Sequence, residues 1–266
     1  MVTGLNDTPI QIHNGVVTEL ILLKTSHEEA DVIMINQLLW VVTTSSTMKS
    51  VKVICDDTDV FALLIHYVHT ENIENTIIMQ ATKNGHPIID IHEVIEKMIA
   101  EKLDTALIIQ VHALSGCDTV AAYYRKGKKT ALKVANKYAD SLNLKIIGDL
   151  TQSEDAVYKA ASHYLSRCYG CLPQEDITDV RAKVWFKKTA MSVHASPKLA
   201  SLPPTEAAFR PNILRGHYQT AIWRSCASQD PPQASPEDYG WYRTVNRPRP
   251  DAALEVHFRG CQPHPT

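Results

Sequence analysis

The sequence has no apolar run close to the roughly 20 residues that a membrane-spanning helix requires. Its opening residues, MVTGLNDTPIQIHNG, have neither the basic start nor the continuous apolar stretch of a secretory signal peptide. We therefore expect a soluble, intracellular protein with no membrane partner, and we favour the nucleus over the cytoplasm.

The sequence also lacks a strong excess of either charge and a dense set of cysteines. It has 27 basic and 29 acidic residues, so any nucleic-acid contact must come from a local basic patch and not from an overall polycation. Its six cysteines are too few for a disulfide framework in 266 residues and are typical of a reducing compartment. This length suits one large globular domain, or one domain with an appendage.

Short β-branched runs alternate with longer helical patterns up to about residue 150. VKVIC (51–55) and TIIMQA (76–81) are typical of strands, and DVFALLIHYVHT between them has apolar residues at helical spacing. These segments predict a strand–helix–strand crossover with parallel strands. NGHPIIDI predicts a turn and a short strand, whereas HEVIEKMIAEKL, KKTALKVANKYADSL and SEDAVYKAASHYLSRCYG predict helices. The predicted fold class is α/β, with a mostly parallel central sheet and helices on both faces.

The composition changes after about residue 195. SPKLASLPPTEAAF and DPPQASPEDYG are interrupted by proline, and RPRPDAALEVHFRGCQPHPT at the end shows little periodicity. Between the first two, RPNILRGHYQTAIWRSC predicts a helix that packs against the body, with Gly216 as its weak point. We expect a main domain over residues 1–195 and a helical, proline-rich appendage over residues 196–266.

Carboxylates gather at three places where predicted elements begin or end: SHEEAD (26–31), CDDTD (55–59) and SGCD (115–118). Asp57 and Asp59 follow a predicted strand, and two residues at this spacing on an extended segment point to the same side. They would therefore converge beyond the carboxyl end of the strand, where open α/β sheets bind ligands.

The first acidic group allows more than one interpretation. Ser26 and Glu29 fit a capping box, which would give Glu29 a structural role at a helix start. On an ideal helix Glu29 and Asp31 are about 200° apart, so they share an ion only over the helix terminus or through water. Glu28 and Asp31, three residues apart, would share a helix face more readily.

Several carboxylates at one point require a counter-charge, because like charges a few Å apart repel. A hard divalent cation such as Mg²⁺ or Mn²⁺ provides it, and two such ions about 4 Å apart stabilise both oxygens of a phosphodiester displacement. Lysines that follow Asp118 would then hold the substrate phosphates. The alternative is that the acids are helix caps and turns and that the lysines form a solvated face.

Three stretches resemble successive motifs of the PIN-like nucleases: EADVIM (29–34), DDTDVFAL (56–63) and LSGCDTV (114–120). In the flap-endonuclease branch of that family the corresponding motifs are E-A-[ED] at a helix start, D-x-D at a strand end and G-[CS]-D after an apolar run. The sequence over about residues 10–245 is similar to PIN-like proteins derived from transposable elements. The family's first strand and first acidic motif have no counterpart that we can assign.

The resemblance implies hydrolysis of DNA, or alternatively RNA, with two Mg²⁺ or Mn²⁺ ions. The implied metal ligands are Glu29, Asp31, Asp57, Asp59 and Asp118, of which Asp57, Asp59 and Asp118 are also the implied catalytic residues. The implied nucleic-acid contacts are Lys126, Lys128, Lys129 and Lys133. Because the first acidic motif is not found, the alternative function is a catalytically inactive nucleic-acid-binding or protein-interaction module.

Overall fold

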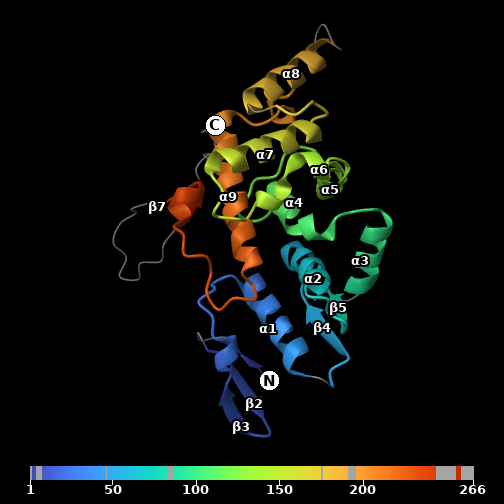
Figure 1. The fold of residues 1–266 in the computed structure, drawn as a ribbon, viewed down its shortest axis with the longest axis vertical. Coiled ribbons are helices and arrows are strands. Elements are labelled where there is room, and N and C mark those ends of the chain that lie inside the picture. Colours follow the sequence, from blue (N-terminus) through green and yellow to red (C-terminus); the bar gives the residue numbers. More distant parts are fainter. Residues whose placement is uncertain are drawn as a thin grey trace. The chain divides into compact units, whose positions relative to one another are not determined.

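The computed structural model describes most of the chain (Figure 1). The described residues are 2–3, 8–45, 47–82, 85, 87–174, 176–190, 196–243 and 256–258. They form two compact units, the first made of Met1–Ile109 and Ile222–Gln233 and the second of Gln110–Ala221 and Ala234–Thr266. The domain boundary that we predicted after residue 195 lies within the second unit.

The first unit contains a small mixed sheet. Strands β4 (Ser50–Ile54) and β5 (Thr76–Gln80) are parallel, and β6 (Ile88–Asp90) is antiparallel to β5. Helix α2 (Thr58–Thr70) connects the two parallel strands, which confirms the predicted crossover. The chain is thus an α/β protein, although its sheet has only one parallel pairing among the described strands.

The helices that follow strands in this sheet begin at aspartates. Asp57 accepts a hydrogen bond from the backbone N–H of Asp59 and so caps α2. Asp90 accepts one from the backbone N–H of His92 and caps α3 (Ile91–Ala100). A carboxylate at this position satisfies backbone donors that the first helical turn leaves free, so each of these aspartates stabilises the start of its helix.

Strand β4 buries side chains on one face of the sheet only. Val53 is buried, whereas Lys52 and Ile54 on the opposite face are exposed. Successive strand residues point to opposite faces, so this alternation identifies a covered face and a solvent face. The prediction of helices on both faces is therefore wrong for this strand in the described structure, because Lys52 places a charge where a second helix layer would need an apolar side chain.

Helix α1 (Ala30–Thr44) packs on α2 through Val32, Ile35 and Leu38, which are buried and spaced along one face. Before it the chain forms a short 3₁₀ helix, η1 (Ile21–Leu23). These contacts hold the beginnings of α1 and α2 in the same unit of the molecule.

A second sheet, entirely antiparallel, precedes α1. It consists of β1 (Val2–Thr3), β2 (Ile10–His13) and β3 (Val16–Glu19) in that order. Asn14 and Gly15 connect the last two strands and both have positive φ. This is the backbone of a tight two-residue hairpin turn, for which Asn-Gly is the favoured sequence.

The second unit is mostly helical. The remaining elements of the chain are η2 (Thr105–Leu107), α4 (Ile108–Leu114), α5 (Lys128–Lys137), α6 (Ala139–Leu142), η3 (Leu144–Ile146), α7 (Glu154–Cys168), α8 (Ile177–Ala190), η4 (Leu199–Ser201), α9 (Glu206–Arg224), η5 (Pro236–Tyr239), β7 (Trp241–Arg243) and β8 (Val256–Phe258). The helices predicted around α5, α7 and α9 are present. In the part of the chain that the structure describes, no helix is both long and apolar enough to cross a membrane.

Helix α9 is a core element of the second unit and not a peripheral appendage. Phe209 and Ile213 are buried, and Gly216 lies against Leu114 and Val120. A Cβ atom built on Gly216 would be 3.5 Å from Leu114 Cδ2 and 3.7 Å from Val120 Cγ2, which are ordinary contact distances. A methyl group would therefore fit at this position, so no steric need for glycine offsets its low helix propensity and Gly216 remains a weak point of the helix.

Buried polar side chains connect α9 to loops of the same unit. Asn212 Oδ1 accepts a hydrogen bond of 2.9 Å from the backbone N–H of Ala121, and His217 Nδ1 accepts one of 3.0 Å from Gly148. A buried polar side chain is stable only when such bonds replace those to water. Because several of its buried side chains are polar, the sequence of α9 did not indicate that the helix is buried.

We expect Gly216→Ala to stabilise the protein by about 0.5–1 kcal/mol, because alanine is the better helix former and its methyl group fits at ordinary contact distances. Urea unfolding measures this change. Gly148→Ala is the control: Gly148 has φ of +88° and its Cβ would lie 2.6 Å from Thr220 Cγ2, so this change should destabilise. A loss of stability in Gly216→Ala would contradict the packing described.

His66 on α2 predicts a pH dependence of stability. Burial, followed by the charges of Arg224 and His69, lowers its pKa from 6.5 to about 4. Because the unfolded chain binds the proton more readily, stability is complete above pH 6.5 and falls as the pH drops toward 4, by up to about 1.4 kcal/mol per pH unit. His66→Gln should lose much of this slope in urea titrations, whereas His69→Gln, on an exposed site of the same helix, should retain most of it. Burial also lowers the pKa of His27, which supplies a remaining slope of the same sign.

Candidate metal centre

Asp57 and Asp59 occupy the junction between β4 and α2. The Asp57 carboxylate accepts the backbone N–H of Asp59 at 2.8 Å, which fixes its direction. Asp59 lies in the first turn of the helix and is only 7% exposed. Both carboxylates therefore sit at the positive end of the helix dipole, which stabilises negative charge.

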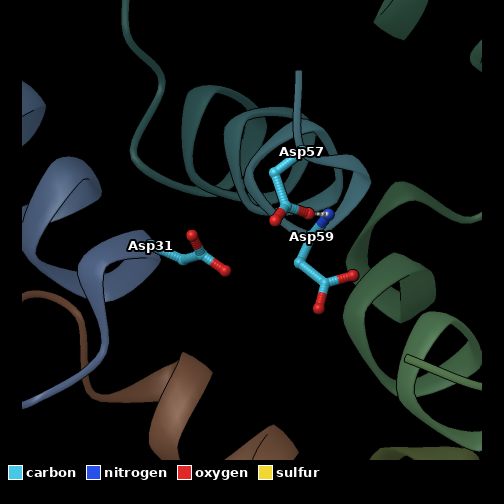
Figure 2. Close-up of side chains that lie close together, drawn as sticks. All are labelled: Asp31, Asp57 and Asp59. Atoms are coloured by element: carbon cyan, nitrogen blue, oxygen red, sulfur yellow. Dashed lines mark hydrogen bonds between the residues drawn. The ribbon is translucent and has the colours of Figure 1, made fainter. Parts of the chain in front are cut away.

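Asp31 brings a third carboxylate from the first turn of α1. One oxygen of each of Asp31, Asp57 and Asp59 lies within 4.8 Å of the other two. Figure 2 shows the Asp31 carboxylate directed toward the other two across the space between the helices. Two segments far apart in the sequence thus place three acidic side chains around one point.

The spacing of these oxygens suits a small divalent cation. In octahedral coordination with oxygens about 2.1 Å from the metal, neighbouring ligand oxygens are about 3.0 Å apart and opposite ones about 4.2 Å apart. Separations within 4.8 Å reach these values after small side-chain rotations. The cluster could therefore hold a metal ion.

The capping box predicted for Ser26 and Glu29 does not form. Helix α1 begins at Ala30, with Glu29 as the N-cap residue, and the Glu29 side chain makes no capping hydrogen bond. Ser26 donates its hydroxyl hydrogen to Asp230 Oδ1 at 2.7 Å instead. The predicted box is wrong because the helix starts three residues later than that motif requires.

Glu29 nevertheless lies close to the acidic cluster. The pKa of the Cys226 thiol is raised to about 12, mainly by burial and in smaller part by the negative charges of Glu29 and Asp31. Glu29 is not one of the three clustered carboxylates. Glu28 precedes the helix and is exposed, so the shared helix face that we considered for Glu28 and Asp31 does not exist.

Asp56 differs in role from its neighbour Asp57. Its carboxylate accepts hydrogen bonds from the backbone N–H and the hydroxyl group of Thr82, which join the loops that follow β4 and β5. A pocket of about 430 Å³ opens beside both aspartates, and its apolar lining includes Phe61 and Met79. The loops at the carboxyl ends of the parallel strands thus border a concave pocket, at the edge of the sheet where open α/β sheets bind ligands.

Asp118 belongs to the second unit, whereas the three clustered carboxylates belong to the first. It is exposed on a turn closed by a β-bridge between Cys117 and Val120. The next residue, Thr119, donates its hydroxyl hydrogen to Gln219 Oε1 at 2.9 Å, which ties the turn to α9. Its role as a metal ligand and catalytic residue stays a prediction.

The four predicted phosphate-binding lysines have different surroundings. Lys128 Nζ donates to the carbonyl oxygens of His112 and Gly116 and so satisfies the end of α4. Lys126 Nζ lies over the Tyr169 ring, 4.7 Å from its centroid. Lys129 and Lys133 are exposed on α5, four residues apart and therefore on one face.

The C-terminal segment of the first unit contributes contacts that the sequence did not reveal. Asn36 of α1 donates to the carbonyl oxygen of Cys226 at 2.9 Å, and the Tyr67 hydroxyl of α2 donates to that of Trp223 at 2.8 Å. These bonds span more than 150 residues of sequence, so no local pattern signals them.

Comparisons of the chain with protein-family models, with curated proteins and with solved structures find no match. The chemistry of the site therefore has to be argued from its own geometry.

We expect Asp57→Asn to weaken Mn²⁺ binding at least about tenfold, measured by isothermal titration, because it removes one of three charged ligands. Asparagine caps a helix as well as aspartate does, so the metal-free protein should be equally stable, or more stable because carboxylate repulsion is reduced. Asp90→Asn is the matched control, since Asp90 caps α3 in the same way outside the cluster. Equal Mn²⁺ affinity in the two variants would show that the cluster does not bind metal.

Proposed function

We propose that this chain is a metal-dependent, PIN-like nuclease domain of transposable-element origin that hydrolyses phosphodiester bonds of DNA. The observation that carries the proposal is the convergence of Asp31, Asp57 and Asp59, from two separate helix starts, on one point. Three convergent carboxylates cost electrostatic free energy in the absence of a cation, so their arrangement favours a role in binding one.

The positions of the acidic motifs support the PIN-like assignment. Glu29 and Asp31 stand at the start of α1, and Asp57 and Asp59 stand at the start of α2, in the connection that follows β4. The resemblance implies a helix start for the first pair and a strand end for the second. The parallel β4–β5 crossover also agrees with that fold, in which we expect a larger parallel sheet.

Three features of the site would contribute to cleavage: the bound ion, the carboxylates that hold it and the helix dipoles. A bound Mg²⁺ or Mn²⁺ ion supplies charge neutralisation at the scissile phosphate and an activated water. Asp31, Asp57 and Asp59 would hold the ion, and the Asp57 cap keeps its own carboxylate in place. The positive ends of the α1 and α2 dipoles reduce the cost of gathering these charges. The resemblance also implies metal-binding roles for Glu29 and Asp118.

The alternative is a nucleic-acid-binding or interaction module that does not cut. The observation that favours it is that the family's first strand and first acidic motif have no counterpart in this sequence that we can assign. Lys129 and Lys133 are exposed in either case and could contact phosphates without catalysis.

Nicking of supercoiled plasmid DNA and cleavage of labelled flap DNA, with Mg²⁺ or Mn²⁺, test the proposal. We expect cleavage by the unmodified chain and by Asp90→Asn, and a fall to the level of the EDTA-treated protein for Asp57→Asn and Asp59→Asn, because each loses a ligand. Asp118→Asn tests the metal-binding role that the resemblance implies for Asp118. DNA binding with no metal-dependent cleavage would support the inactive module, and equal cleavage by Asp57→Asn would contradict the proposed site.

A further inference from the structure

Helix α8 uses only a narrow stripe for packing. Ile177, Val180 and Val184 are buried, and α8 contacts α7 in the same unit (Figure 1). Trp185 and Phe186 lie outside this stripe and are 43% and 64% exposed. Two adjacent large aromatic side chains in water are unfavourable for folding, so their exposure calls for an explanation other than the stability of the unit.

The charges around the two rings are mainly positive. Within α8 the charged residues are Arg181, Lys183, Lys187 and Lys188 against Asp179, four positive and one negative. Lys187 and Lys188 are exposed in the last turn, whereas Asp179 lies in the first turn. The helix dipole alone favours this order of charges, but it does not account for the exposed rings between them.

Two of the four cations on α8 have partners within the second unit. Arg181 Nη1 donates to the carbonyl oxygen of Pro203, and Lys183 Nζ donates to Gln174 Oε1. Lys188 is three residues beyond Trp185, and Lys183 is three residues before Phe186, so each ring has a lysine as its neighbour on the helix surface. Trp185 and Phe186 lie on the exposed side of α8, with Lys188 beyond Trp185 at one edge and Lys183 and Lys187 beyond Phe186 at the other; this exposed side is called the aromatic–lysine face below.

The two rings are nearly perpendicular. Their centroids are 5.2 Å apart and their planes make an angle of 78°. Bases stack on aromatic rings in parallel planes, so the rings of Trp185 and Phe186 cannot both stack on neighbouring bases of a duplex. A single strand has a flexible backbone, so two successive bases can take different orientations and each can stack on one of the two rings.

We propose that the aromatic–lysine face binds single-stranded nucleic acid, with bases stacked on Trp185 and Phe186 and phosphates held by Lys187 and Lys188. Aromatic side chains combined with lysines form the usual platform for strands without sequence preference. The inference deepens the proposed function, on which it rests for the choice of nucleic acid as the partner, and it names an unpaired strand as the substrate. An anionic membrane is the other polyanion that aromatic rings and lysines can meet. Ile177, Val180 and Val184 are already buried in the unit, so Trp185 and Phe186 are the only large apolar side chains that α8 could place in a membrane, which favours the strand.

Fluorescence anisotropy of labelled oligothymidylate of 20 residues, with the full chain in EDTA, tests the proposal without any cleavage. We expect binding that weakens as salt increases from 50 to 200 mM, because phosphate contacts release counterions. A 20-base-pair duplex should bind at least about tenfold more weakly. Quenching of tryptophan fluorescence by the strand should accompany binding, and it should be lost when Trp185 is replaced.

Two pairs of substitutions locate the binding face. Trp185→Leu/Phe186→Leu keeps the apolar character and helix propensity but removes the stacking surfaces, so affinity should fall at least about tenfold. Lys187→Glu/Lys188→Glu should weaken binding and reduce its dependence on salt. The matched controls are Leu172→Ala/Leu199→Ala, which alter exposed apolar residues elsewhere in the second unit, and Lys49→Glu/Lys52→Glu in the first unit. These controls should bind the strand more tightly than the α8 variants.

Failure of this proposal is distinguishable from failure of the proposed nuclease activity. Asp57→Asn should bind the strand as the unmodified chain does, whether or not that chain cuts DNA. Unchanged strand affinity in Trp185→Leu/Phe186→Leu, or equal affinity for strand and duplex, would overturn the inference. The inference would also be overturned if the protein bound phosphatidylserine vesicles through Trp185 and Phe186 and did not bind the strand.

Discussion

The hydroxyl group of Tyr67 is the contact on which the acidic site most depends. It donates a hydrogen bond to the carbonyl oxygen of Trp223 and accepts one from the backbone N–H of Cys226. These two bonds hold the segment around Trp223 and Cys226 against α2. Burial raises the pKa of this hydroxyl well above its ordinary value, so it keeps the proton that it donates. The same segment is fastened to α1 by Asn36, through the carbonyl oxygen of Cys226. The two helices that bear the three carboxylates are thus held by one short stretch of chain.

The acidic cluster illustrates how one side chain can serve both folding and chemistry. Asp57 stabilises the start of α2 through its hydrogen bond to the backbone of Asp59, and the same orientation presents it to Asp31. Helix starts are favourable places for carboxylates, because backbone N–H groups and the helix dipole both stabilise negative charge. Three such charges at one point still repel, and this residual repulsion is what a divalent cation would relieve. Stability in the absence of metal and affinity for metal are therefore opposed at this site.

Local patterns in the sequence identified much of the first unit. Alternating and helical periodicities located β4, α2 and β5. Asp57 and Asp59 do lie close together, but Asp59 is in the first turn of α2 and not on the extended segment from which their convergence was predicted. The patterns failed where a residue had several possible partners. A capping box was plausible for Ser26, yet its hydroxyl group bonds to Asp230. Lysines that were expected to contact phosphate include Lys128, which instead satisfies carbonyl groups at the end of α4. Which partner such a side chain contacts depends on groups that are distant in the sequence.

The sequence by itself determined the α/β class, the parallel crossover and the acidic character of the β4–α2 junction, because periodicity and helix capping act between residues a few positions apart. Only the tertiary structure decided that Asp31 joins Asp57 and Asp59, that α9 is a core helix, and that Trp185 and Phe186 face solvent. Those outcomes follow from packing and hydrogen bonds between segments distant in the chain. The same side chain can be buried or exposed, and paired with one partner or another, without any change in the local pattern that contains it.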